Sequence, residues 1–131
     1  MGKRALVIDD DPMIRMLVKA ILEDDGYTVV LADDGKEGVR IIDAEPRPIN
    51  FTLIVLDVVM PGMNGLDVLT RLKLHAHTQS LPVIMLTGED KAEDIMAAYS
   101  VGADYYVTKP FTRQQLLYGI GLVLSGGAKK E

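Results

Sequence analysis

The stretch ALVIDDDP, residues 5–12, contains the pattern that the rest of the chain repeats. Its first four residues, Ala5–Ile8, are all apolar, and short continuous apolar runs are typical of strands buried on both faces of a sheet. Asp11 followed by Pro12 is typical of a helix start, because aspartate caps free backbone N–H groups and proline is tolerated at the first helical position. The stretch therefore predicts a strand that leads directly into a helix.

The same unit recurs along the chain. The other runs of strand character are Tyr27–Ala32, Leu53–Leu56, Val83–Leu86 and Tyr105–Val107. Capping-box patterns open the segments between and after them, in which the residue three positions after the cap bonds back to the cap N–H. They are Asp34 with Glu37, Asp90 with Glu93 and Thr112 with Gln115, and Asn64 with Asp67 is a looser relative. Five alternations of strand and helix predict an α/β fold: a doubly wound (βα)₅ parallel sheet with helices on both faces.

Length and composition set the class of protein. A chain of 131 residues that is 48% hydrophobic suits one domain with one core, expected at residues 3–124 with a flexible tail or linker remnant at 125–131. No apolar run approaches the ~20 residues of a membrane span. There is no cysteine, so we expect a cytoplasmic protein without disulfides. The net charge of −5 argues against nucleic-acid binding by this domain itself.

Polar residues follow the predicted strands at their carboxyl ends. Asp9 and Asp10 follow the first run, Asp57 the third, Thr87 the fourth and Lys109 the fifth. In an open parallel sheet these ends line the crevice in which ligands bind. A single aspartate after a strand is usually a cap, and Asp11 is left in that role. The joint arrangement instead predicts a site.

The residue types at that edge point to phosphoryl chemistry. Clustered carboxylates repel one another and favour a cation, and oxygen ligands suit Mg²⁺. A carboxylate in such a cluster, Asp57, can act as a nucleophile and form an acyl phosphate. Lys109 offers a positive charge and Thr87 a hydroxyl donor to phosphoryl oxygens.

Four segments resemble the receiver family of bacterial response regulators: Leu6–Pro12, Asp57–Gly65, Val83–Gly88 and Gly102–Phe111. They occur in the family's order and spacing, and the resemblance extends from about Lys3 to Leu124. It implies the strand order 2-1-3-4-5, which is known for flavodoxin-like folds, with a chemotaxis receiver as the standard example.

The resemblance implies a signalling switch with no external turnover substrate. Asp57 would accept a phosphoryl group from a sensor histidine kinase or a histidine phosphotransfer protein. Mg²⁺ would be bound by Asp10 and Asp57, by Asp9 mainly through water, and by the backbone carbonyl of Val59. Lys109 would hold phosphoryl oxygens together with Thr87.

Further roles follow from the same resemblance. Thr87 would move toward the phosphoryl group, and Tyr106 would then turn inward as the switch residue. The Lys109–Pro110 peptide bond would be cis. The readout surface would be the fourth helix, fifth strand and fifth helix, which would control a downstream output protein or domain.

Residues near the phosphoacceptor complete the implied set. Pro61 and Gly65 would have structural roles in the phosphoacceptor loop. Val59 and Glu89 border the mouth of the site and resemble positions that tune the rate of dephosphorylation.

The fifth helix leaves one question open. Tyr118 and Leu122 lie opposite its apolar stripe, and no charged residue occurs between Arg113 and Lys129. This patch indicates either a homodimer or partner contact, or two ordinary exposed apolar residues.

Three other functions compete with the receiver assignment. A phosphatase of the haloacid dehalogenase type also uses an aspartyl nucleophile and Mg²⁺, but it requires an Asp-x-Asp motif after its first strand. A receiver-like binding module that is never phosphorylated would not need the complete site. A flavodoxin-like nucleotide-binding domain would carry a glycine-rich loop after the first strand, and none is present.

Overall fold

The computed structural model describes residues 2–88 and 92–125, without the side chains of Thr87 and of residues 92–94. The strands are β1 (Lys3–Ile8), β2 (Tyr27–Ala32), β3 (Leu53–Asp57), β4 (Val83–Thr87) and β5 (Tyr105–Thr108). The helices are α1 (Pro12–Asp24), α2 (Gly35–Ala44), α3 (Gly65–Leu74), α4 (Ala92–Val101) and α5 (Arg113–Leu124). The predicted (βα)₅ alternation is confirmed.

All five strands pair in parallel, in the order β2-β1-β3-β4-β5. The register places Ile8 beside Leu56, Asp57 beside Leu86, and Thr87 beside Thr108. The carboxyl ends of the central strands therefore lie at one edge of the sheet. The expected strand order is confirmed.

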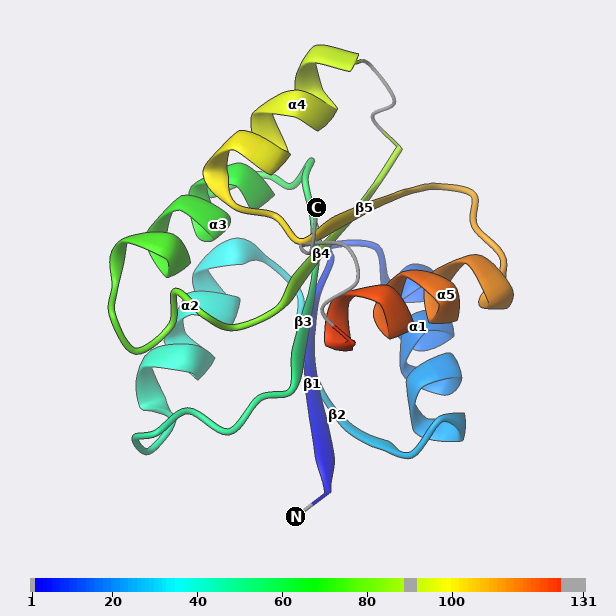
Figure 1. Cartoon of the computed structure of the whole chain (residues 1–131), viewed down its shortest axis with the longest axis horizontal. Helices are drawn as coiled ribbons and strands as arrows, with labels where there is room; N and C mark the ends of the chain where they lie inside the picture. Colours follow the sequence, from blue (N-terminus) through cyan, green and yellow to red (C-terminus); the bar gives the residue numbers. More distant parts are fainter. Residues whose placement is uncertain (1, 89–91, 126–131) are drawn as a thin grey trace.

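Helices cover both faces of this sheet, with α1 and α5 on one side and α2, α3 and α4 on the other (Figure 1). Alternate residues of β1 point into different layers. Leu6 and Ile8 belong to the core beneath α2–α4, whereas Ala5 and Val7 belong to the core beneath α1 and α5. A strand buried on both faces needs an uninterrupted apolar run, which explains the composition of residues 5–8.

Most helix starts follow the predicted caps. They are Asp11 before α1, Asn64 with Asp67 before α3, and Thr112 with Gln115 before α5. Asp34 caps α2 through Glu37 N at 2.8 Å, but the predicted return bond from Glu37 is wrong, because its carboxylate binds Arg40 instead. The pair Asp90 and Glu93 lies outside the described part of the chain. No helix in the described ranges has the length and apolar character needed to cross a bilayer.

Candidate functional site

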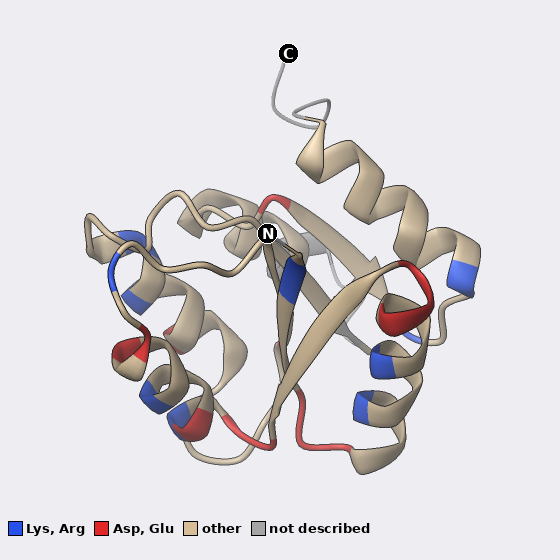
Figure 2. Cartoon of the chain, turned by 90° about the horizontal axis from the view of Figure 1, so that it is seen from below, with Lys and Arg blue, Asp and Glu red and all other residues tan. Residues whose placement is uncertain are grey.

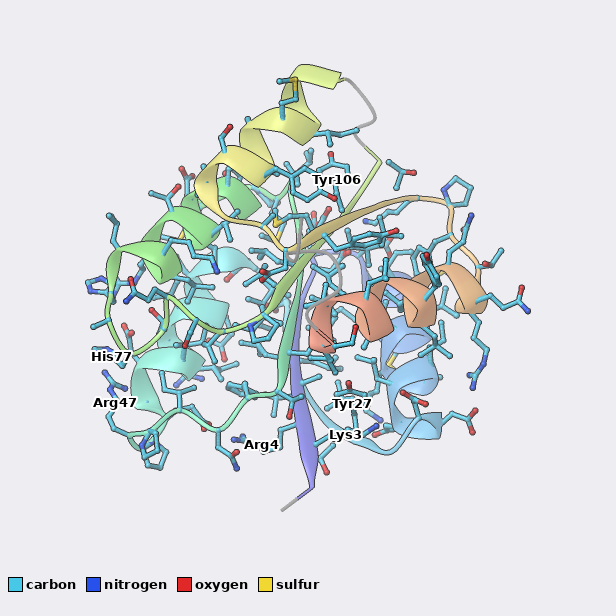
Figure 3. All side chains as sticks on the ribbon, viewed as in Figure 1. Lys3, Arg4, Tyr27, Arg47, His77 and Tyr106 are labelled. Carbon is cyan, nitrogen blue, oxygen red and sulfur yellow. The ribbon has the colours of Figure 1, made fainter. Side chains whose placement is uncertain are left out.

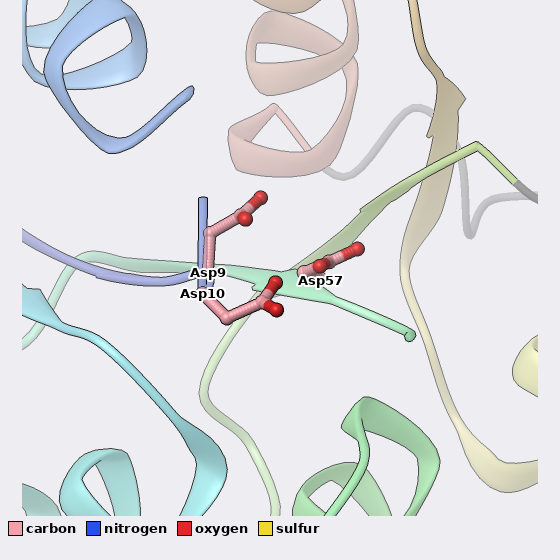
Figure 4. A group of neighbouring side chains, drawn as sticks. All are labelled: Asp9, Asp10 and Asp57. Atoms are coloured by element: carbon pink, nitrogen blue, oxygen red, sulfur yellow. The ribbon is translucent and has the colours of Figure 1, made fainter. Parts of the chain in front are cut away.

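Three carboxylates meet at the carboxyl ends of β1 and β3. Asp9 and Asp10 follow β1, and Asp57 is the last residue of the neighbouring strand β3. One carboxylate oxygen from each residue lies within 4.8 Å of those of the other two, and Figure 4 shows the three side chains turned toward a common space. Asp9 and Asp57 are only 1% and 3% exposed, whereas Asp10 is exposed to solvent.

Lys109 supplies positive charge to this acidic cluster. It follows β5, and its Nζ lies 3.1 Å from Asp9 Oδ2 and 3.5 Å from Asp57 Oδ1. The contact with Asp9 Oδ2 is an ion pair without hydrogen-bond geometry, so this buried oxygen accepts no hydrogen bond within the described structure. This ammonium therefore contacts two of the three carboxylates in the cluster. Figure 2 shows acidic segments on the loops at one end of the sheet, while acidic and basic residues are mixed on the helices.

The electrostatics of the cluster act most strongly on Asp57. The pKa of its carboxyl is raised to about 7, mainly by burial, then by the neighbouring charge of Asp9 and, to a smaller extent, by that of Asp10. The Lys109 ammonium opposes this shift without cancelling it. A carboxylate that is this costly to ionise is stabilised by any cation that enters the cluster.

The residues present fit a hard divalent cation. The donors are carboxylate oxygens alone, one of which has no hydrogen bond, and the exposed side of Asp10 leaves room for water ligands. Mg²⁺ favours oxygen ligands and keeps several of its waters. The donor set of Asp9, Asp10 and Asp57 therefore suits Mg²⁺.

The loop that carries Asp9 is held on several sides. Asp9 N donates to Ala32 O at 3.2 Å, and Asp9 Oδ1 accepts from Asp11 N at 2.9 Å. The backbone carbonyl of Asp9 accepts from the Arg15 guanidinium at 2.7 Å. Sequence reasoning did not single out Arg15. The sequence feature that could have identified it is a basic residue one turn into the helix that follows the acidic run Asp9–Asp11.

The loop that follows Asp57 returns closely to the strand that it leaves. Gly65 N donates to Val58 O at 2.8 Å, and a Cβ at position 65 would collide with the backbone carbonyl of Asp57. Pro61 lies exposed in this loop, and the Val59 side chain is 57% exposed beside the site. Glycine at position 65 therefore lets α3 begin directly against Asp57.

Two predicted site residues are only partly covered by the structure. The backbone of Thr87 ends β4 opposite Thr108, which places it at the edge that carries the carboxylates, but its side chain is not described. Glu89 lies outside the described residues. The Lys109–Pro110 peptide bond is cis, and so is the Arg47–Pro48 bond, which was not predicted.

Tyr106 lies half-buried on β5 (Figure 3), in contact with a residue that sequence reasoning missed. Tyr99 on α4 packs against it, with ring centroids 6.5 Å apart. Burial is the main cause that raises the pKa of the Tyr99 hydroxyl. On α5, Tyr118 is 64% exposed and Leu122 is half-buried, so the predicted apolar patch is only partly exposed.

Curated relatives resemble this chain along most of its length. It is 39% identical over 124 residues to the phosphate regulon transcriptional regulatory protein PhoB of Klebsiella pneumoniae, covering 95% of this chain and 52% of the relative. It is 40% identical over 117 residues to the response regulator MprA of Mycobacterium ulcerans, covering 89% of this chain and 48% of the relative. The chain therefore spans about half the length of the curated relatives it matches.

Solved structures and a family model agree with these relatives. The chemotaxis protein CheY4 of Vibrio cholerae superposes with a TM-score of 0.85 at 32% identity, covering 95% of this chain and all of CheY4. A CheY-like receiver domain protein from Methanospirillum hungatei superposes with a TM-score of 0.85 at 33% identity, with both chains covered completely. The model of the response regulator receiver domain matches residues 5–120. This chain belongs to the response regulator receiver domain family.

Proposed function

We propose that this chain is a phosphorylation-activated switch whose phosphoacceptor is Asp57. Receivers of this family act in two-component signalling, where response regulators pair with histidine kinases and output domains. The observation that carries the proposal is the position of Asp57: a buried carboxylate at the crevice, with Lys109 Nζ 3.5 Å away and two further carboxylates beside it. The receiver would span residues 3–124, followed by a tail.

The chain's acidic residues would hold the metal ion. Asp10 and Asp57 would ligate Mg²⁺ directly, with Asp9 mainly through water and the Val59 backbone carbonyl as a further ligand. When bound, Mg²⁺ supplies positive charge that offsets both the crowded carboxylates and the charge that builds on a transferring phosphoryl group.

The covalent step is a transfer from nitrogen to oxygen. An ionised Asp57 oxygen attacks the phosphorus of a phosphohistidine on a sensor kinase or phosphotransfer protein. The phosphorus–nitrogen bond breaks, and its electron pair returns to the imidazole of the donor. Lys109 then shifts part of its contact from the carboxylates to a phosphoryl oxygen, and Thr87 donates its hydroxyl to another.

The added phosphoryl group would change the equilibrium between two conformations of the domain. It brings roughly 1.5–2 negative charges and new acceptor oxygens. To move a two-state equilibrium from 1:99 to 99:1 requires about 5.5 kcal/mol, which a few charge-assisted hydrogen bonds at ~1.5–3 kcal/mol each supply. Thr87 would move toward the phosphoryl group and Tyr106 would turn inward, which alters the surface of α4, β5 and α5.

That surface would then control a downstream protein or output domain, directly or through a homodimer. The curated relatives named above include transcriptional regulators about twice as long as this chain. The net charge of −5 disfavours direct nucleic-acid binding by this domain. Val59 and Glu89 lie two residues after Asp57 and Thr87 in the sequence. They would tune the rate at which water removes the phosphoryl group.

Intact-protein mass spectrometry tests the phosphoacceptor. The protein is incubated with acetyl phosphate and Mg²⁺, with EDTA in place of Mg²⁺ as one control and the variant Asp57→Asn as the other. We expect a gain of one phosphate that hydroxylamine removes and that is absent from both controls. Phosphorylation of Asp57→Asn to the wild-type extent would overturn the assignment.

A further inference from the structure

Arg15 bonds a backbone carbonyl although acidic groups surround it. Its guanidinium donates to Asp9 O at 2.7 Å, and its side chain lines a surface hollow of about 410 Å³ with Leu31, Asp33 and Glu37. Within the described parts of the chain, Arg15 forms no ion pair, and the neighbouring Glu37 is paired with Arg40. The Arg15 guanidinium therefore binds the peptide between Asp9 and Asp10 rather than a carboxylate.

That peptide determines where Asp10 is placed. Because the peptide group is planar, the direction of the Asp9 carbonyl also fixes the direction of the Asp10 N–H and the position of its Cα. Two other contacts, from Asp11 N and to Ala32 O, hold Asp9 itself. The Arg15 contact is the one that restrains the link to Asp10.

Asp10 has little else to hold it. Its side chain is exposed, and within residues 2–88 and 92–125 it takes part in no ion pair. Asp9 and Asp57, in contrast, are buried and lie beside the Lys109 ammonium. The orientation of the Asp10 carboxylate thus depends on the backbone, which Arg15 holds at the peptide before Asp10 and the Asp11 N–H holds at the peptide after it.

We propose that Arg15 is a positioning residue for the metal site, which holds the Asp9–Asp10 peptide so that the Asp10 carboxylate faces Asp57. The proposal rests on the magnesium-dependent function proposed above. Arg15 touches neither metal nor phosphoryl group. It already restricts Asp10 in the metal-free protein, so that less conformational freedom is lost when a cation binds. Residues that orient metal ligands in this way typically change metal affinity by about 10–100-fold when they are replaced.

Isothermal titration of the protein with Mg²⁺ at fixed ionic strength tests the proposal. Arg15→Met keeps the apolar stem but removes the donor, and we expect about tenfold weaker binding. Arg15→Lys restores a charged donor and should recover most of that loss. The matched control is Arg40→Met, which removes an exposed positive charge from α2, where Arg40 pairs with Glu37, and should leave the affinity within about twofold, because exposed charges are screened.

Two further readouts separate positioning from a general structural role. Thermal unfolding in EDTA should be similar for wild type and Arg15→Met, while the Asp10 and Asp11 amide resonances of the metal-free variant should shift. If Arg15→Met does not fold, Arg15→Gln, which is shorter and neutral, takes its place with the same expected direction.

The outcomes distinguish the two proposals. Wild-type protein that does not bind Mg²⁺ would overturn the proposed function. Wild-type protein that binds Mg²⁺ while Arg15→Met binds it equally well would overturn only the role of Arg15. Equal weakening by Arg15→Met and Arg40→Met would also overturn that role, because it would indicate loss of charge rather than loss of position.

Discussion

The ammonium of Lys109, at the end of edge strand β5, lies 3.1 Å from Asp9 Oδ2, at the end of β1, with β3 and β4 between the two strands. The same nitrogen is 3.5 Å from Asp57 Oδ1. Lys109 therefore joins the two buried carboxylates and occupies the space where positive charge is most strongly favoured.

This relationship predicts opposite effects of Lys109→Met on two properties. Without the ammonium, the metal-free protein should lose up to ~3 kcal/mol of stability at pH 8, because two buried carboxylates lose their counter-charge. Mg²⁺ should bind several-fold more tightly, because the site becomes more negative. Urea denaturation in EDTA measures the stability of the metal-free protein, and calorimetric titration measures its affinity for Mg²⁺. Weaker Mg²⁺ binding by Lys109→Met would contradict the prediction.

The raised pKa of Asp57, about 7, predicts the pH dependence of the metal-free protein. Between the ordinary carboxyl pKa of 3.8 and about 7, the folded state binds more protons than the unfolded state. Stability must therefore fall as the pH rises through this window. We expect the midpoint of thermal unfolding in EDTA to decrease from pH 5 to pH 7.5.

Two controls accompany this measurement. Asp57→Asn removes the titrating group, so its midpoint should vary much less over the same range. Saturating Mg²⁺ should reduce the slope for wild type, because a bound cation favours the ionised carboxylate. A wild-type midpoint that varies with pH in the same way as that of Asp57→Asn would contradict the raised pKa.

The strand ends could be predicted from sequence because the fold imposes strict local rules. A strand buried on both faces demands an uninterrupted apolar run, so the first polar residue after Ala5–Ile8 marks the edge of the sheet. Parallel pairing then brings Asp9, Asp57 and Lys109 to that edge. Their distances and burial could not be predicted, since they depend on how the layers pack.

The sequence pattern did not predict contacts between side chains of different helices and strands. The pairing of Tyr99 with Tyr106 joins α4 to β5, and no periodicity relates the two positions. The predicted capping bond from Glu37 was wrong for a local reason. Arg40, one turn further along, offers two charged N–H groups, which compete better for the carboxylate than one backbone amide.

Gly65 predicts a steric effect at the phosphoacceptor. In Gly65→Ala, the added Cβ would meet the Asp57 carbonyl and the Val58 backbone, which cannot move without displacing β3 or α3. We expect a loss of about 1–3 kcal/mol, measured by urea denaturation, and slower phosphorylation by acetyl phosphate. The matched control is Gly121→Ala on α5, where a Cβ meets nothing within 4 Å. It should gain about 0.5–1 kcal/mol. Equal stability of the two variants would refute the steric explanation.

The contact between Tyr106 and Tyr99 predicts that Tyr106→Ala separates phosphorylation from its readout. The tyrosine ring lies outside the cluster of carboxylates, so acetyl phosphate should modify Asp57 at a rate within about twofold of wild type. An acyl-phosphate mimic should shift the amide resonances near Asp57 in both proteins. The shifts on β5 and along α4 should be much smaller in the variant, because the ring that contacts Tyr99 is gone.

Tyr118→Ala, which removes a 64% exposed ring from α5, is the control and should keep the shifts on α4. Unchanged shifts on α4 in Tyr106→Ala would show that the phosphorylation signal reaches this helix by another route.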